Sequence, residues 1–344
     1  MKQYKVGIIG LFAYGTDDCG GGVIKTRNYE SILKEKYGSD QIITLDRADD
    51  SSSFVWIKKV IYICANSDVV IVMFSTKKMI TLLLPVLVLL KSCLHFKLLY
   101  PVLGGWIADF LNEHRIMRAL FKNIDEIYVE THSMKREISK ILDNVVYMPN
   151  FSIRRPIKKV NEYNSSEYSF CIYSRIVKEK GIEIAINAIR KVNEIYGKDI
   201  CKLYIYGKVY DSYKEEFERL INDNTHVVIY GGLLGNQALN VISKHYIMLF
   251  PTYYEGEGFP GTLVEAFMAG IPVIASDWKY NSEIIEEGKT GYLFDLKEDD
   301  SLVNIICKAI CLPETVNKMR FNCLQESKKY IPDSVMQPIY RWIH

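Results

Sequence analysis

The chain has 344 residues, a hydrophobic content of 49%, a charged content of 24% and a formal net charge of +2. These values are typical of a globular protein that is long enough for two domains, and they argue against extensive disorder. The net charge is too small to indicate a nucleic-acid-binding protein.

The cysteines and the N-terminus indicate the compartment. The eight cysteines occur singly, with no C-x-x-C pair and no histidine at the spacing of a metal site, so we expect them to be reduced and mostly buried. The apolar run Tyr4–Gly10 is too short for a secretory signal and lacks a cleavage pattern, which predicts a cytoplasmic protein. The cysteines are Cys19, Cys64, Cys93, Cys171, Cys201, Cys307, Cys311 and Cys323.

The first half of the chain alternates apolar runs with helical segments, which predicts a parallel sheet covered by helices. A glycine-rich loop that ends at Gly20–Gly22 follows the first strand. It is not a G-x-G-x-x-G motif, and Thr16-Asp17 stands where a P-loop would need Lys-Ser or Lys-Thr, so neither a dehydrogenase nor an NTPase is supported. We predict strands at Lys5–Gly10, Gln41–Leu45, Asp68–Phe74, Lys97–Leu103, Ile124–Glu130 and Val145–Met148, and helices at Val23–Tyr37 and Val55–Cys64.

The segment Met79–Leu90 is almost wholly apolar and is flanked by Lys77, Lys78 and Lys91. It contains Pro85 and is too short to span a bilayer, which needs about 20 residues. A packed helix is the first interpretation. A helix that dips into a membrane surface through its apolar face is the second.

Two strand ends in this half carry candidate residues for an acceptor substrate. The strand that ends at Leu103 leads into Gly104-Gly105-Trp106, at the edge where α/β sheets place ligands. His132 follows the strand that ends at Glu130, although a loop or helix-cap histidine is the more common interpretation there.

The polar segment Arg154–Ser166 predicts a linker, which gives one domain over residues 1–153 and another over residues 167–330. The second domain repeats the alternation of strands and helices. Residues 299–344 have helical tendency, with breaks at three prolines. We predict strands at Tyr168–Ser174, Lys202–Tyr206, Val227–Tyr230, Tyr246–Phe250, Ile271–Ser276 and Thr290–Phe294, helices at Ile182–Tyr196 and Asn281–Glu287, and breaks at Pro313, Pro332 and Pro338.

The most informative loop follows the strand Tyr246–Phe250. Several glycines and a proline precede the helix-compatible segment Leu263–Ala269, which Gly270 caps. Such a loop is an anion site, because the first N–H groups of the helix are unpaired and the helix dipole adds positive charge. The N–H groups expected to be unpaired are those of Gly261, Thr262 and Leu263.

Two carboxylates, Glu257 and Glu265, bracket this anion site. A carboxylate beside a phosphate repels it, whereas a carboxylate accepts strong hydrogen bonds from sugar hydroxyls. A ligand with both phosphate and sugar hydroxyls suits the loop, which predicts a nucleotide sugar.

The sequence Glu257-Gly-Phe-Pro-Gly-Thr-Leu-Val-Glu265, followed by Ala266 and Gly270-Ile-Pro-Val-Ile-Ala, resembles the E-x7-E signature of the retaining glycosyltransferases of family four. The resemblance implies two Rossmann-like domains facing across a cleft, the GT-B fold, with a C-terminal helix over residues 331–344 that returns to the first domain. It also implies transfer of a sugar, with retention of configuration, from a nucleoside-diphosphate sugar to a lipid-linked or growing polysaccharide acceptor. UDP-sugars are the more frequent donors, and peripheral attachment to the inner face of a membrane would suit such an acceptor.

The resemblance also suggests roles for single residues. Glu257 matches the position that faces the donor sugar, and Glu265 the position that binds the ribose hydroxyls. The segment from Arg175 to Gly181 is similar to the family's G-R-x-x-x-x-K-G, with Ser174 in the glycine position, so Arg175 and Lys180 carry over as diphosphate ligands. Without the resemblance, a surface loop is the better interpretation of that segment. Further donor-binding candidates are Gly258, Phe259, Pro260, Gly261, Thr262, Leu263, Gly207, Gly231, Gly21 and Gly22.

Many family members carry a histidine near Gly104, where this chain has glycines and His114 further on, so no catalytic histidine is assigned. We expect neither a metal nor a cofactor, because the chain lacks the D-x-D triplet typical of metal-dependent sugar transferases. Two other interpretations stay open. One is a non-catalytic subunit that binds a sugar nucleotide or a polysaccharide. The other is a glycoside hydrolase with Glu257 and Glu265 as its carboxyl pair, although a hydrolase needs no phosphate site.

Overall fold

The structure is a computed structural model that describes residues 4–16, 20–48, 53–74 and 76–344, with no account of the side chains of residues 53 and 54. The predicted features at Asp17 and Cys19 lie outside these residues. The chain forms two compact units. The first comprises Met1–Ile153, Gly256–Phe259 and Ile331–His344, and the second comprises Arg154–Glu255 and Pro260–Tyr330.

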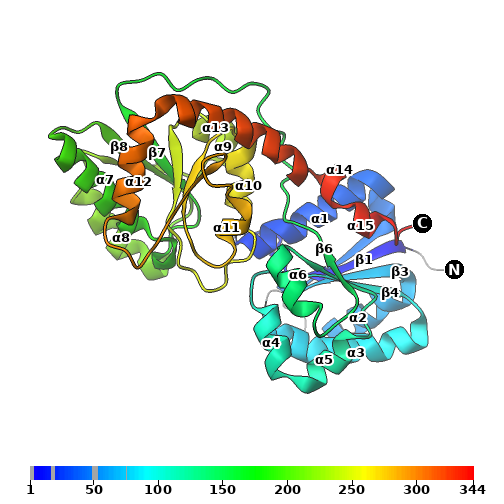
Figure 1. The fold of residues 1–344 in the computed structure, drawn as a ribbon. Helices are drawn as coiled ribbons and strands as arrows, with labels where there is room; N and C mark the ends of the chain where they lie inside the picture. The colour runs from blue at the N-terminus through cyan, green and yellow to red at the C-terminus, as the bar shows by residue number, and fades with distance from the viewer. Residues whose placement is uncertain (1–3, 17–19, 49–52, 75) are drawn as a thin grey trace. The chain divides into compact units, whose positions relative to one another are not determined.

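The first unit is built on a parallel sheet with the strand order β2-β1-β3-β4-β5-β6. Its strands are continuous apolar runs because helices cover both faces of a parallel sheet. Figure 1 shows α2, α3 and α5 on one face. Within the described residues the strands are β1 (Tyr4–Gly10), β2 (Ile42–Asp46), β3 (Ser67–Met73), β4 (Lys97–Pro101), β5 (Glu126–Val129) and β6 (Val145–Tyr147).

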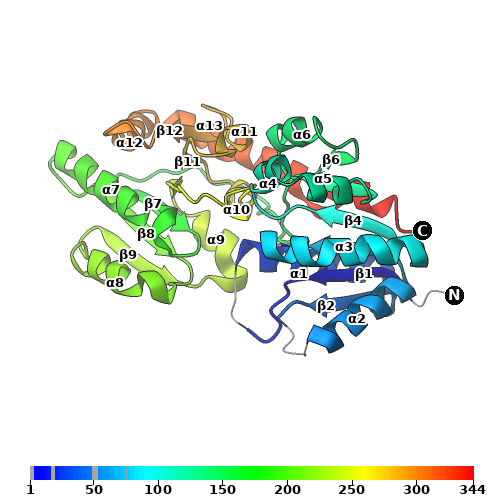
Figure 2. The ribbon, with the colours of Figure 1, turned by 90° about the horizontal axis from the view of Figure 1, so that it is seen from below.

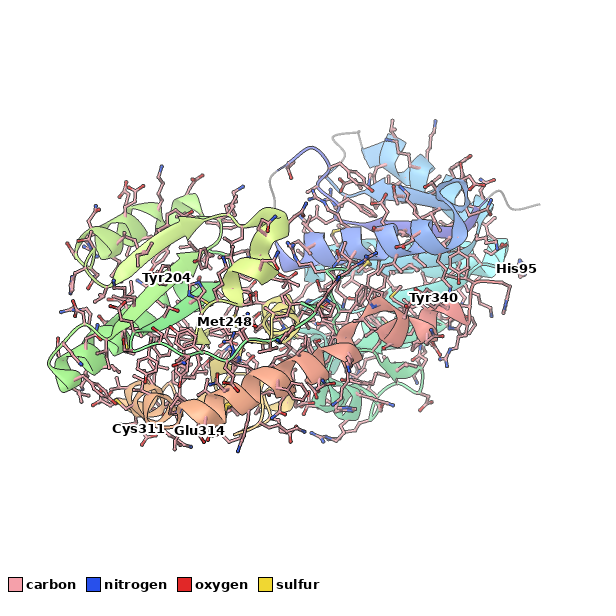
Figure 3. All side chains as sticks on the ribbon, turned by 90° about the horizontal axis from the view of Figure 1, so that it is seen from above. His95, Tyr204, Met248, Cys311, Glu314 and Tyr340 are labelled. Atoms are coloured by element: carbon pink, nitrogen blue, oxygen red, sulfur yellow. The ribbon has the colours of Figure 1, made fainter. Side chains whose placement is uncertain are left out.

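The C-terminal residues belong to the core of this first unit. Val335, Met336, Ile339 and Ile343 pack in one cluster with side chains of β1 and α1. Tyr340, labelled in Figure 3, meets the ring of Tyr37 edge-on at 6.2 Å. The helices of this unit are α1 (Gly21–Tyr37), α2 (Ser53–Asn66), α3 (Lys77–Leu94), α4 (Ile107–Glu113), α5 (Arg115–Phe121), α6 (His132–Ile138), α14 (Pro332–Val335) and α15 (Gln337–Tyr340).

The second unit has its own parallel sheet, with the order β12-β11-β10-β7-β8-β9. Figure 2 shows α8 beside β9 at one edge. Met248, labelled in Figure 3, lies on the interior strand β10. The strands are β7 (Tyr168–Tyr173), β8 (Cys201–Tyr206), β9 (Val228–Gly232), β10 (Ile247–Phe250), β11 (Val273–Ser276) and β12 (Gly291–Phe294). The helices are α7 (Ile182–Tyr196), α8 (Lys214–Asn222), α9 (Ala238–Ile242), α10 (Gly261–Met268), α11 (Asn281–Ile284), α12 (Ser301–Cys311) and α13 (Pro313–Glu326).

This arrangement confirms the predicted fold class of two Rossmann-like α/β domains. The long helices and all the strands are those predicted, within a few residues at their ends. Pro313 and Pro332 each begin a helix, where a missing N–H costs nothing, and Pro338 is the second residue of α15. The short helices α4, α5, α8 and α9 were not predicted.

The apolar segment Met79–Leu90 lies within α3, whose residues Ile80, Leu83, Leu84 and Leu87 are buried. The packed-helix interpretation is therefore confirmed for that side of the helix. Across the ranges that the structure describes, no helix combines the length and the apolar character needed to cross a membrane.

The described cysteines are all free thiols. Cys64, Cys171, Cys201 and Cys323 are buried, as expected for most of them, whereas Cys93 and Cys311 are exposed.

Candidate functional site

The carboxyl end of the second sheet gathers the two predicted phosphate ligands. Arg175 follows β7, and its guanidinium carbon lies 5.6 Å from the ring centre of Tyr254. The ammonium nitrogen of Lys180 lies 5.4 Å from the same ring centre. Two cations therefore lie near one aromatic ring, an arrangement that cation–π attraction stabilises. Sequence reasoning missed Tyr254, although its place four residues after the end of β10 was a usable signal.

A close contact between two loops holds Lys180 in place. Gly181 has a φ of +70°, and a Cβ there would lie 2.0 Å from the carbonyl oxygen of Pro251. The N–H of Tyr253 also donates to the carbonyl of Glu179 at 2.9 Å. Only glycine permits this approach, which fixes Lys180 beside the loop after β10.

The electrostatic surroundings favour an anion near these side chains. Lys180 is only 7% exposed. Arg175 is half-buried, and no carboxylate in the described part of the chain forms an ion pair with it. A partly desolvated guanidinium without a carboxylate partner is well suited to bind phosphate oxygens.

Gly207 directly follows β8, and Gly231 lies within β9. Packing requires glycine at both positions. A Cβ at Gly207, which has a φ of +144°, would lie 1.7 Å from the carbonyl oxygen of Ser174. A Cβ at Gly231 would lie 2.2 Å from the ring of Tyr206. These contacts bring the ends of β7, β8 and β9 close together, so the glycines have a structural reason that is independent of any ligand.

The predicted anion site begins the helix α10, with Pro260 as its N-cap. Gly261 and Thr262 are the first two residues of the helix, and their N–H groups have no acceptor within a regular helix. The expectation for Leu263 is wrong, because its N–H donates to the carbonyl of Pro260 at 3.1 Å and its side chain is fully buried. The helix start therefore offers two amides rather than three.

Glu265, the fifth residue of α10, forms an ion pair that the sequence did not reveal. The Nε of Arg154 lies 3.0 Å from its Oε1. Burial, and then the carboxylate of Glu265, raises the pKa of Tyr173, so this hydroxyl stays protonated beside the pair. Arg154 orients the carboxylate of Glu265, and a carboxylate is a strong acceptor for hydroxyl groups.

Glu257 lies in the segment Gly256–Phe259, which groups with the first unit. Its side chain is largely buried, at 8% exposure. Gly258 and Phe259 are buried as well. Glu265 belongs to the second unit, so the two glutamates of the motif are assigned to different units.

A buried ion pair contacts this segment, and sequence reasoning missed it. Lys25 of α1 lies 2.7 Å from Oε1 of Glu130, which directly follows β5, and the two side chains are 5% and 4% exposed. Oε2 of Glu130 accepts a hydrogen bond from the N–H of Phe259 at 3.3 Å. A charged residue in the buried stripe of a helix, and another directly after a buried strand, were the signals that could have identified the pair.

The remaining candidates in the first unit lie at loop ends. Gly21 begins α1 in open space, with no atom within 4 Å of an added Cβ, and Gly22 is half-buried beside it. Gly104 has a φ of +83°, and Gly105 is half-buried. The indole N–H of Trp106 donates to the carbonyl of Leu103 at 2.8 Å.

His132 is the first residue of α6 and is exposed. Its ring stacks on Tyr147, with ring centres 3.9 Å apart. Across the described ranges, no cluster of three or more histidine, cysteine or acidic side chains could hold a metal ion.

The comparison with protein families decides the family of the chain. Residues 153–325, just over half of the chain, match the family described as glycosyl transferases group 1. The chain belongs to this family. The matched range contains Arg175, Lys180, Glu257 and Glu265, and it confirms the resemblance predicted from the sequence at the level of a group 1 glycosyltransferase.

Two curated relatives are similar to about half of the chain. An uncharacterized 41.2 kDa protein in the cps region of Klebsiella pneumoniae is 28% identical over 170 residues, which are 48% of this chain and 44% of the relative. The lipopolysaccharide 1,2-N-acetylglucosaminetransferase of Salmonella typhimurium is 28% identical over 166 residues, which are 46% of this chain and 42% of the relative. The chain therefore spans less than half the length of these two relatives.

A solved structure supports the fold of the whole chain. The Anabaena protein HepE, crystallised in complex with UDP, superposes with a TM-score of 0.73 at 14% identity and covers 98% of both chains. The same protein in complex with UDP-glucose gives a TM-score of 0.71 at 15% identity. At this level of identity the likeness establishes the fold.

Proposed function

We propose that the chain transfers a sugar from a nucleoside-diphosphate sugar, with UDP as the favoured nucleotide, to a glycan or lipid-linked glycan. The observation that carries this proposal is the meeting of Arg175 and Lys180 at Tyr254, at the carboxyl end of the sheet that also leads into α10. Two cations and two helix-start amides provide what a diphosphate requires. The UDP and UDP-glucose complexes of HepE support the choice of nucleotide.

In this proposal the diphosphate and the ribose of the nucleotide bind different groups of the protein. The diphosphate binds Arg175 and Lys180, together with the N–H groups of Gly261 and Thr262. The ribose hydroxyls donate to Glu265, whose carboxylate Arg154 already orients. The glycines at 207 and 231, and those at 21 and 22, let the backbone approach the ligand closely.

The chemical step breaks the bond between the anomeric carbon and the diphosphate oxygen and forms a bond from that carbon to the acceptor oxygen. The diphosphate gains negative charge as it leaves, and the nearby cations and amides stabilise that charge without a metal. Retention of configuration follows if the leaving phosphate takes the acceptor's proton on the same face, so that no protein base is needed. Glu257 then holds a sugar hydroxyl and favours the positive charge that develops at the anomeric carbon.

The names of the two curated relatives point to polysaccharide or lipopolysaccharide synthesis, which supports a glycan acceptor of capsule or exopolysaccharide type. We propose that the chain meets such an acceptor at the cytoplasmic face of a membrane, with Gly104, Gly105, Trp106 and His132 as acceptor-side residues.

Calorimetry with UDP tests the binding roles. Glu265→Gln should weaken UDP binding by about 1.5–3 kcal/mol, because a neutral amide loses the charged hydrogen bonds to the ribose. Arg175→Gln should weaken UDP binding but leave the binding of uridine unchanged, since uridine has no phosphate.

The control for both variants is Glu257→Gln, which should keep the affinity for UDP because UDP carries no sugar at the diphosphate. Loss of UDP binding in Glu257→Gln, with normal binding in Glu265→Gln, would reverse the assigned roles.

A further inference from the structure

The buried ion pair of Lys25 and Glu130 contacts the segment Gly256–Phe259. Glu130 uses its two oxygens separately, because Oε1 accepts from Lys25 at 2.7 Å and Oε2 accepts from the N–H of Phe259 at 3.3 Å. Lys25 is fixed in turn by the carbonyl oxygen of Val102, at 3.1 Å from its ammonium nitrogen. Lys25 therefore binds one oxygen of the Glu130 carboxylate, and the other oxygen binds the backbone of the segment.

Further contacts restrict the same segment. The amide of Asn150 donates to the carbonyl of Phe259 at 2.9 Å, so both backbone polar groups of Phe259 are bound within the first unit. A Cβ at Gly258 would lie 2.9 Å from Oε2 of Glu130 and 3.0 Å from the Cα of Gly104. Glycine at position 258 thus permits the contact between the segment and Glu130.

A buried ion pair is a poor means of stabilising a fold. Both charges lose their hydration, and apolar side chains of similar volume often give equal or greater stability. Lys25 and Glu130 are both buried, so the presence of this pair suggests a role other than stability. The group that Glu130 contacts is the amide of Phe259, two residues after Glu257.

We propose that Glu130, held by Lys25, is a positioning residue that fixes the segment Gly256–Phe259 and thereby the carboxylate of Glu257. The inference rests on the proposed function, in which Glu257 acts on the donor sugar. Glu130 does not touch the substrate in this account. It supplies the geometry that Glu257 needs, and small displacements of a catalytic group are costly to the rate.

The chemistry of the pair gives a test by loss and rescue. In Glu130→Gln, Lys25 attracts the amide oxygen, so the NH2 group faces the N–H of Phe259 and two donors oppose each other. In the double variant Lys25→Met/Glu130→Gln the ammonium is gone, and the amide oxygen is free to accept from Phe259 again. We expect Glu130→Gln to lower kcat by about tenfold or more, with KM and the affinity for UDP within about twofold, and the double variant to recover most of kcat.

A matched control lies at the other end of the same strand. Glu126 of β5 is also buried, and it binds Tyr128, Arg341 and Trp342 rather than the segment. Glu126→Gln should lower the melting temperature and leave kcat unchanged. A kcat for Glu130→Gln equal to that of the parent, or a double variant as slow as the single one, would overturn the inference.

Hydrogen exchange gives a readout that does not need turnover. The amide of Phe259 should exchange faster in Glu130→Gln than in the parent protein, and slowly again in the double variant. If the parent released no nucleotide from any sugar nucleotide, the proposed function would be wrong. Hydrogen exchange would still test the contact between Glu130 and the Phe259 amide. Unchanged exchange of the Phe259 amide in Glu130→Gln would then overturn the positioning role by itself.

Discussion

At the scale of single residues, the candidate site depends on contacts between segments that are distant in sequence. Arg175 and Lys180 meet at Tyr254, and Arg154 pairs with Glu265 of α10. A buried histidine also makes the free energy of unfolding depend on pH. His245 is 6% exposed, and its Nε2 lies 3.0 Å from the hydroxyl oxygen of Tyr206.

Burial, and then the charges of Arg320 and Lys244, lowers the pKa of His245 to about 4 from its ordinary value of 6.5. Below pH 6.5 the unfolded chain binds a proton that the folded protein does not bind, so the free energy of unfolding falls as the pH drops from 6.5 to about 4. The total loss from this group is about 3 kcal/mol. Urea unfolding at several pH values should therefore show a shallower pH dependence for His245→Gln than for the parent.

The control for this measurement is His226→Gln, which removes an exposed histidine of the same unit. It should leave the pH dependence of unfolding unchanged. Equal slopes for the parent and His245→Gln between pH 4 and 6.5 would contradict the account.

At the scale of elements, glycines fix how the loops after β7, β8 and β9 fit together. Gly207 approaches Ser174, which precedes Arg175, while Gly197 caps α7 with a φ of +64° and no atom within 4 Å of an added Cβ. Both glycines have a positive φ, but the φ of +144° at Gly207 lies in a region that is open almost only to glycine, so the two positions differ in backbone strain as well as in packing.

Gly197→Ala should cost about 1 kcal/mol of stability, from backbone strain alone. Gly207→Ala should cost more, about 3 kcal/mol or above, because the new methyl group displaces the carbonyl of Ser174. It should also weaken UDP binding, since Arg175 moves with its neighbour. Chemical denaturation and calorimetry measure both effects, and an equal cost for the two variants would show that packing at Gly207 does not matter.

The helix α3 leaves Leu82 and Leu89 exposed, at 66% each, on the side away from its buried residues. If this side meets an anionic membrane, Lys77→Glu/Lys78→Glu should weaken binding to vesicles by about 1 kcal/mol per lysine. Lys91 is a poor choice for this test, because it pairs with Asp125 at 2.7 Å. Lys318→Glu, on α13, serves as the control for charge alone. If the parent protein does not float with anionic vesicles, the membrane role of α3 is wrong.

Elements with a clear pattern could be predicted from the sequence, and those that depend on tertiary contacts could not. The bounds of α7 agree with the prediction because its apolar residues repeat with helical spacing and Gly181 and Gly197 mark its ends. The short helices α4 and α5 carry too few residues for a periodic signal. The ion pairs Arg154–Glu265 and Lys25–Glu130 span 111 and 105 positions, so no local pattern could reveal them.

At the scale of the whole molecule, the chain builds two Rossmann-like units, and the family match lies almost wholly on the second. The motif that suggested a nucleotide sugar is divided between the units, with Glu257 in one and Glu265 in the other. We therefore propose that the second unit determines the affinity for the nucleotide and that Glu257 determines the rate of sugar transfer.

Release of nucleotide from a panel of UDP- and GDP-sugars, with mass spectrometry of the products, tests this account most directly. We expect the parent protein to release UDP from at least one UDP-sugar. Glu257→Gln should release UDP about a hundredfold more slowly or worse while still binding UDP, because the contact of Glu257 with the sugar strengthens in the transition state. Binding of UDP without release from any donor would instead indicate a non-catalytic binding subunit. A Glu257→Gln variant as fast as the parent would contradict the catalytic role of Glu257.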